Sequence, residues 1–552
     1  MFRWIVVLLC ASGSLCANKH HISYLIQAGE WESAIDAYEQ HKEQFGRHDF
    51  EVLQQMATIV LEQGMKSSNP EQQLISMFGA GVAGMRAPLD CVEAGLSSPH
   101  PETQMAAIHA LSRIQDDRSE ELLKKAMASP FFFARMEAAH QMAIRKSFSA
   151  VGQIEALMHR VPPPMRFFFP PFFALIGTKD AITVLKHLMD EPFHMTRIEA
   201  ILNAAKFGRD DLLPSIRRKA THSSPAEQET CATALGMLKD LKSRPLLNKL
   251  ASSPSPNVQL AALLSLELLG ERQTKIAEMA RQEDLYAICA LGNLPGSEDL
   301  LFTLTRHKNI QVRFNAMFAL LIRKDPRVVH PLLEFLIRDA RDLGFQPHPS
   351  IGHSLASWKV VPSASQHQAK EGYDLLTLSL SVREYLLRLA LELPEETFLS
   401  VVQALFDAKQ KELMPRLVEL IENTRTPQTI NKLKQYAQIA GAPLIRTYCL
   451  IALIRLQEPG FDESAITDWL SAHHHTQMIE FRPALPWDLR LHQKQTAFEL
   501  TPEEHSRLLI LCYQTLAERH STGSIDLILK GLRNGHPNNR PVLAGLLIYA
   551  LQ

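Results

Sequence analysis

The feature that most constrains this chain is a helical pattern that returns about every 31 residues. In residues 309–336, Val312, Ala316, Ala319 and Leu320 recur at i, i+4, i+7 and i+8, which places them on one face of an α-helix. Taking the last position as an anchor gives the series Ala80, Leu111, Met142, Leu175, Ala204, Leu235, Leu266, Leu291 and Leu320, then Ala390, Ile421, Leu453, Leu516 and Leu551. The series indicates an internal repeat.

Between anchors lies a second apolar helix, such as residues 119–127 or 326–337. One antiparallel pair of short helices cannot bury both its faces alone, so neighbouring pairs must stack. The sequence therefore predicts an all-α chain, an α-solenoid or superhelix of stacked antiparallel helix pairs.

Residues 312–323 (V-R-F-N-A-M-F-A-L-L-I-R) and 445–456 (I-R-T-Y-C-L-I-A-L-I-R-L) resemble the second helix of HEAT repeats, chiefly the short, phycobilisome-lyase-like variety. The resemblance implies a scaffold that binds proteins, because most HEAT arrays act as scaffolds or bind proteins. Arg313, Arg383 and Arg446 occupy one repeat position. There the resemblance implies a structural arginine, bonded to turn carbonyls or to an acid of a neighbouring repeat.

Residues 24–39 resemble half of a tetratricopeptide repeat through Gly29, Trp31, Ala34 and Tyr38. The predicted organisation is therefore a signal peptide at 1–17, a tetratricopeptide-like helical cap at 18–66, a repeat array at 67–340, an inserted loop at 341–376, and C-terminal repeats at 377–552 with a second insertion at 473–500.

The first residues have the layout of a secretory signal. Arg3 precedes the apolar run from Trp4 to Ala11, and small residues follow up to Ala17. This layout, which looks bacterial, predicts export to a periplasm or extracellular space, with a mature chain that begins near Asn18. No later segment offers about 18 uninterrupted apolar residues, so we expect no membrane span in the mature chain. The formal charge of -1 argues against a nucleic-acid partner.

Searches for chemistry give no catalytic residue, cofactor site or metal site. The chain has no His-Glu dipeptide, as a HEAT-type di-iron hydroxylase would need, and no GxSxG, HExxH, Walker A or Rossmann motif. His473, His474 and His475 point about 100° apart on a helix and so do not converge on one ion. The cysteines after the signal are far apart and set in apolar helical patterns, which predicts small core residues: Cys91, Cys231, Cys289, Cys449 and Cys512.

Two aromatic triplets, Phe131, Phe132, Phe133 and Phe167, Phe168, Phe169, lie one repeat apart. They either fill the core between repeats or form an exposed patch that binds a partner. We expect stacking to bring them into one contiguous cluster.

The repeat interval fails at residues 341–376 and 473–500. These insertions contribute further candidate partner-binding residues: Phe345, Trp358, Phe481 and Trp487. Long loops are uncommon unless functional or disordered, and this composition is not that of disorder. We expect both loops to project from one edge into a single binding region. Deleting residues 345–370 should then spare folding and weaken partner binding.

The sequence thus favours an exported, non-catalytic HEAT-repeat scaffold with a protein partner. One alternative is a lyase-like or metal-dependent modifying enzyme built at the inserted loops. Another is a structural subunit of an envelope or secretion assembly.

Overall fold

The computed structural model describes residues 19–338, 343–350, 352–353, 355–361, 375–438, 443–479, 481 and 502–552. These residues form two compact units. Unit 1 joins residues 1–142 with residues 421–552, and unit 2 comprises residues 143–420. Both units consist of stacked antiparallel helix pairs, so the predicted all-α solenoid is confirmed. The expected signal peptide lies outside the described residues.

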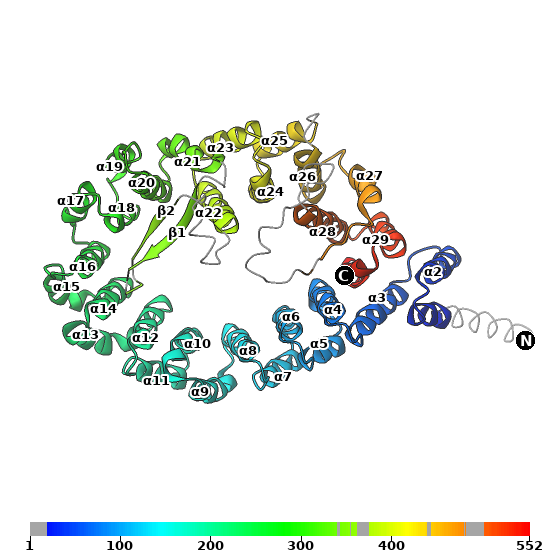
Figure 1. The fold of residues 1–552 in the computed structure, drawn as a ribbon, viewed down its shortest axis with the longest axis horizontal. Helices are drawn as coiled ribbons and strands as arrows, with labels where there is room; N and C mark the ends of the chain where they lie inside the picture. Colours follow the sequence, from blue (N-terminus) through cyan, green and yellow to red (C-terminus); the bar gives the residue numbers. More distant parts are fainter. Residues whose placement is uncertain are drawn as a thin grey trace, which may run out of the picture. The chain divides into compact units, whose positions relative to one another are not determined.

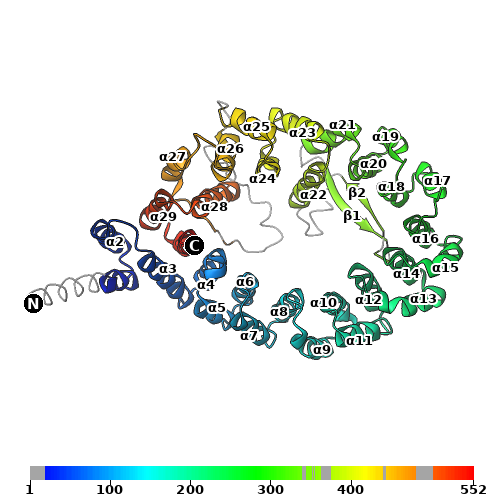
Figure 2. The same ribbon diagram turned by 180° about the vertical axis from the view of Figure 1, so that it is seen from behind.

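Each pair has a first helix and a second helix, which we assign to an A layer and a B layer. The B layer holds the anchor residues; within each unit the two layers run side by side in Figure 1 and, from behind, in Figure 2. In unit 1 the A helices are α3 (Phe50–Met65), α5 (Leu89–Leu96), α7 (Asp117–Ala126), α25 (Pro427–Ala437), α27 (Ser464–His473) and α29 (Thr522–Asn534), preceded by α2 (Trp31–Phe45). Its B helices are α4 (Pro70–Val82), α6 (Pro101–Ser112), α8 (Phe132–Ile144), α26 (Pro443–Arg455), α28 (Pro502–Arg519) and α30 (Arg540–Ala550).

Unit 2 has an A layer and a B layer of its own. Its A helices are α9 (Val151–Arg160), α11 (Lys179–Leu188), α13 (Leu213–His222), α15 (Arg244–Leu250), α17 (Lys275–Arg281), α19 (Glu298–Leu304), α21 (Val329–Ile337) and α23 (Glu395–Asp407). Its B helices are α10 (Pro170–Ile176), α12 (His194–Lys206), α14 (Pro225–Met237), α16 (Pro256–Leu268), α18 (Leu285–Leu291), α20 (Ile310–Ile322), α22 (Leu375–Ala390) and α24 (Met414–Thr424). Short 3-10 turns include η5 (Leu241–Ser243) and η6 (Pro326–Val328).

The B helices start and end in recurring ways. Proline at the first position opens α14 and α16, where its missing N–H costs nothing. Four residues past the anchor, the chain turns with a positive φ, at Lys146 (53°), Lys239 (52°) and Lys324 (59°). This left-handed residue ends the helix and returns the chain toward the A layer. Because the turn recurs, equivalent side chains of successive repeats line up along the solenoid.

An arginine near the start of several B helices bonds the preceding turn. Arg313 donates from Nη1 to the carbonyls of His307 (3.1 Å) and Lys308 (3.3 Å), and its Nη2 lies 3.3 Å from a carboxylate oxygen of Glu334. Arg135 and Arg197 bond the carbonyls five and six residues before them in the same way. This arginine ties the turn to the helix that follows.

Arg383 and Arg446 differ from Arg313 in their burial. Arg383 is buried on α22, and its guanidinium lies 6.0 Å from the ring of Phe345. Arg446 is exposed on α26. The equal repeat position predicted from sequence therefore leads to three different environments.

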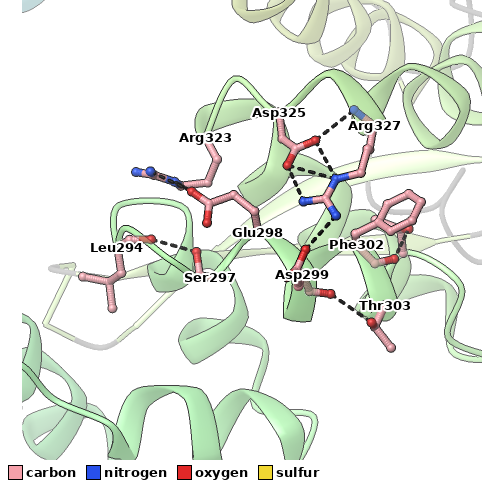
Figure 3. A network of polar contacts seen from close by, with 10 residues as sticks. Leu294, Ser297, Glu298, Asp299, Phe302, Thr303, Arg323, Asp325 and Arg327 are labelled. Atoms are coloured by element: carbon pink, nitrogen blue, oxygen red, sulfur yellow. Dashed lines mark hydrogen bonds and ion pairs between the residues drawn. The ribbon is translucent and has the colours of Figure 1, made fainter.

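Charged networks join the turns at the C-terminal ends of the B helices. Figure 3 shows one of them, in which Arg327 donates to Asp325 and, over 2.7 Å, to Asp299. In the same network Arg323 pairs with Glu298 at 2.8 Å. The hydrogen bonds from Arg327 hold the pKa of the Asp325 carboxyl below its ordinary value. Each of these acids pairs with an arginine, which belongs either to the same repeat or to the next one.

In unit 1 the last repeat stacks on the first. Helix α30 packs against α3 and α4, and α29 contacts α2. The backbones of α4 and α30 approach so closely that a Cβ at Gly79 or Gly545 would overlap a main-chain carbonyl oxygen of the other helix. Polar contacts flank this crossing, among them Arg86 to the Leu551 carbonyl (3.0 Å). The first and last repeats of unit 1 are therefore packed as neighbours.

Candidate functional site

The described part of the first insertion forms a β-hairpin. Strand β1 (Gly344–Pro349) pairs antiparallel with β2 (Ala356–Val361), with Phe345 opposite Val360 and Pro347 opposite Trp358. The hairpin lies against the B helices α18, α20 and α22, as both views show. The sequence predicted a loop projecting from an edge, whereas strands β1 and β2 of this insertion lie on the B helices. Its aromatic side chains pack it onto the B layer instead.

Phe345 provides the apolar anchor of the hairpin. Its side chain is 0% exposed, and its ring centroid lies 4.8 Å from that of Phe314 and 6.2 Å from that of Phe335. The half-buried Trp358 meets Phe314 and Phe318 edge-on. Phe345 was predicted to contact a partner, and its complete burial contradicts this.

Asn315 provides the polar anchor. From α20 its Oδ1 accepts the N–H of Trp358 (2.7 Å), and its Nδ2 donates to the carbonyl of Trp358 (2.8 Å). The same amide accepts from the Cys289 thiol (2.8 Å) and donates to the Gln311 carbonyl (2.7 Å). An amide group can make four such bonds, so this fully buried side chain is saturated. Asn315 bonds both the N–H and the C=O of Trp358, as the backbone of a neighbouring strand would.

Two more residues at the same repeat position hold the hairpin. Asn315, Tyr286 and Thr230 each lie five residues before an anchor, on α20, α18 and α14. Thr230 donates to the carbonyl of Gly352 (3.0 Å), and the Tyr286 hydroxyl lies 2.9 Å from Nδ1 of His348. Burial, with a lesser contribution from the Glu229 carboxylate, raises the pKa of Tyr286. One helix position thus holds an extended segment across several repeats.

The outer edge of β1 is poor at pairing with another strand. The N–H and C=O of Trp358 both point to Asn315, so Trp358 and Pro347 form a pair without mutual hydrogen bonds. Pro347 and Pro349 then both face the edge of β1 that points away from β2, where neither can donate. The hairpin is built against the addition of a further strand.

The tip of the hairpin reaches α14 next to a surface hollow. Ser350 hydrogen-bonds the buried carboxylate of Glu229, and a Cβ at Gly352 would lie 2.7 Å from the Ala226 carbonyl oxygen. The hollow, of about 790 Å³, is lined by Asp190, Glu191, Pro192, His194, Arg197, Lys219, Ser223, Ser224, Pro225, Ala226 and Glu227. Its charges are paired, since Arg197 binds Glu227, Lys219 lies 2.7 Å from Asp190, and Glu191 lies 2.8 Å from Arg166 outside the hollow.

The aromatic triplets are divided between surface and core. Phe133 (73% exposed) and Phe168 (41% exposed) face solvent, whereas Phe169 is completely buried. Phe131, Phe132 and Phe167 are half-buried. Phe169 is thus wrong as a partner contact. The first triplet belongs to unit 1 and the second to unit 2, and their joining into one cluster stays a prediction.

Residues 480 and 482–501 of the second insertion, with Trp487, lie outside the described part of the chain. Phe481 is half-buried. Before it, the ring of His473 stacks on Trp469 at 4.4 Å and meets His505 at 4.6 Å. Burial and the neighbouring His473 lower the pKa of His505. The single binding region predicted for both insertions stays a prediction.

Within the described residues there is no group of three His, Cys, Asp or Glu side chains that could hold a metal ion. The five cysteines that the structure describes are free, and burial raises the pKa of the Cys289 thiol to about 12. No described helix is long and apolar enough to cross a membrane.

Comparisons with known proteins agree with the repeat architecture. Residues 59–143 match the family model described as HEAT repeats. These residues therefore contain HEAT repeats, and the predicted resemblance to HEAT repeats is confirmed. No curated protein sequence matches.

Among solved structures, the karyopherin Kap121p is similar at 14% identity and a TM-score of 0.34, covering 97% of this chain and 59% of that one. Kap121p bound to Pho4p gives 14% identity, a TM-score of 0.34, and coverage of 98% and 61%. This chain thus spans less than two thirds of their length. Likeness this low has no bearing on the partners of this protein.

Proposed function

We propose that the protein is an exported, non-catalytic scaffold that binds protein partners on the B-layer face of unit 2. A HEAT-repeat solenoid has the architecture of a protein-interaction scaffold. The observation that supports this face is that it already binds the hairpin. Thr230, Tyr286 and Asn315, from one repeat position, hold an extended polypeptide, largely through its main chain. A partner's extended segment needs contacts of the same kind.

The row of equivalent positions continues beyond the hairpin tip. On α12 the residue five before the anchor is Glu199, which is half-buried and bonds Asn203 of its own helix. Helix α12 packs against α14, so Glu199 stands next to Thr230 in the row. Glu199 is therefore the first position of the row at which a bound segment would contact a part of the B layer that the hairpin does not cover.

A photo-cross-linking amino acid at Glu199, in protein expressed in its native cell, tests the proposal. We expect discrete protein adducts at this position. The control carries the same group at Lys186, which is exposed on the A helix α11. Equal adducts from both positions, or none from Glu199, would contradict binding on the B layer.

Export is tested on the same native material. The intact mass should correspond to a chain that begins near Asn18, because the apolar run has the length of a signal and the small residues end there. Full-length protein retained in the cytoplasm would contradict export.

A further inference from the structure

Exposed apolar side chains line the C-terminal ends of α12, α14 and α16. Leu241 and Leu268 are 60% exposed, Met237 42% and Phe207 38%. Met237 and Leu268 both lie two residues past their anchors, and Phe207 lies three past its own. Helix α14 packs against both α12 and α16, so these residues follow one another at about 10 Å per repeat. We call Phe207, Met237, Leu241 and Leu268 the apolar stripe.

Lysines without ion-pair partners accompany the stripe. Lys206, Lys239 and Lys242 are exposed on the same turns, and no ion pair within the described part of the chain involves them. Two nearby acids are already engaged: Asp240 binds Arg217 through two bonds of 2.6 Å, and Glu271 lies 3.2 Å from Arg244. The bond from Arg217 lowers the pKa of Asp240.

Asp210 and Asp211, exposed on the turn after α12, and Glu267, on α16 beside the stripe, offset part of this charge. Arg209 and Arg272 lie on the same turns and make no ion pair within the described part of the chain, so these basic residues and the three lysines together outnumber the acids. The stripe therefore retains an excess of positive charge beside its apolar side chains.

The equivalent turn after α20 has no such excess. There Arg323 and Arg327 are neutralised by the acids of the network in Figure 3, and Lys324 lies 2.9 Å from Glu392. Free lysines are therefore not a necessary product of this turn, and they occur where the apolar side chains are exposed.

The stripe shares a helix face with the residues that hold the hairpin. Met237 lies seven residues after Thr230 on α14, and seven residues are nearly two helical turns. The stripe and the hairpin thus lie on the same B-layer face, the stripe nearer the C-terminal ends of the helices. A segment bound along the stripe would run beside the hairpin.

We propose that the apolar stripe is the docking surface for an acidic protein segment with large apolar side chains. This inference rests on the proposed function for the class of partner, and it adds the partner's chemistry. Acidic groups would pair with Lys206, Lys239 and Lys242, while apolar side chains would cover Met237 and Leu268. Three repeats span about 20 Å, the length of a helix of about 14 residues.

A designed peptide tests this chemistry. It is a fluorescent amphipathic helix of about 14 residues with glutamates on one face and leucine and phenylalanine on the other. Fluorescence anisotropy with the full chain should show saturable binding. The variant Lys206→Glu/Lys239→Glu/Lys242→Glu and the variant Leu241→Ser/Leu268→Ser should each weaken it at least about tenfold. These side chains are exposed, and an unchanged thermal melt would show intact folding. The control Lys186→Glu, on α11, should bind like the wild type.

Each contrary outcome has a distinct meaning. If an all-glutamate peptide bound as tightly as the amphipathic peptide, binding would depend on unspecific charge attraction alone, and the proposal would be overturned. Binding to phosphatidylglycerol vesicles but not to the peptide would assign the stripe to a lipid surface and overturn it as well. If both variants bind the peptide as tightly as the wild type while cross-links at Glu199 persist, the proposed role of the stripe is wrong and the proposed function stands. If peptide binding behaves as expected but no cross-links form at Glu199, the proposed function is wrong and the peptide-binding property of the stripe stands.

Discussion

Gly545→Ala should lower the free energy of unfolding of unit 1 by about 3 kcal/mol, at the upper end of the usual cost of overpacking. A methyl group at this position would overlap the carbonyl oxygen of Gly79, so the backbones of α4 and α30 must move apart. Helix α30 also packs on α3, and its displacement would loosen the stacking of the last repeat on the first. Calorimetry of the full chain should show a fall of roughly 5–10 °C in the Tm of the affected transition.

Gly523→Ala is the matched control. Gly523 lies on the neighbouring helix α29, where an added Cβ would meet nothing within 4 Å. Alanine favours helix over glycine by up to about 1 kcal/mol, so the Tm should stay equal or rise slightly. Equal melting of both variants would contradict the close crossing of α4 and α30.

Phe345→Ala should cost about 3–5 kcal/mol, the usual range for removing a fully buried phenylalanine. The substitution would empty the space between Phe314 and Phe335 and weaken the docking of the hairpin on α20. Urea unfolding followed by tryptophan fluorescence, to which Trp358 of the hairpin contributes, would report the loss. The earlier expectation that residues 345–370 can be deleted without effect on folding is revised for the same reason.

Gln346→Ala is the control for this substitution. Gln346 is the next residue on β1 and is exposed, so its truncation should change stability by less than about 0.5 kcal/mol. If Phe345→Ala were equally mild, the hairpin would be a loosely attached loop.

The repeat could be predicted from sequence because it depends on local spacing. The positions of Val312, Ala316, Ala319 and Leu320 fix the buried face of α20, and all four side chains are buried. Stacking follows from that face without knowledge of any distant contact. The same reasoning found that Arg313 marks a recurring position. It missed that Arg135 and Arg197 make the same turn contacts, although their surrounding residues resemble each other.

The hairpin and its site could not be predicted in this way. The contacts of Trp358 with Asn315 join residues 43 positions apart, and those of Gly352 with Thr230 join residues 122 apart. Helical periodicity carries no information about such distant pairs. One signal was present, since Asn315, Tyr286 and Thr230 are polar residues at one repeat position. Their shared offset from the anchors would have identified the face that holds the hairpin.

The B layer of unit 2 holds an extended segment through one repeated helix position, and amide hydrogen exchange of the hairpin tests this most directly. The N–H of Trp358 donates to the buried amide of Asn315, so it should exchange as slowly as the amides of α20. The N–H groups that face the other strand in the hydrogen-bonded pairs should be protected with it, namely those of Gln346, His348, Ser357 and Lys359. Exchange of the Trp358 amide at the rate of an unprotected chain, while α20 stays protected, would contradict the account.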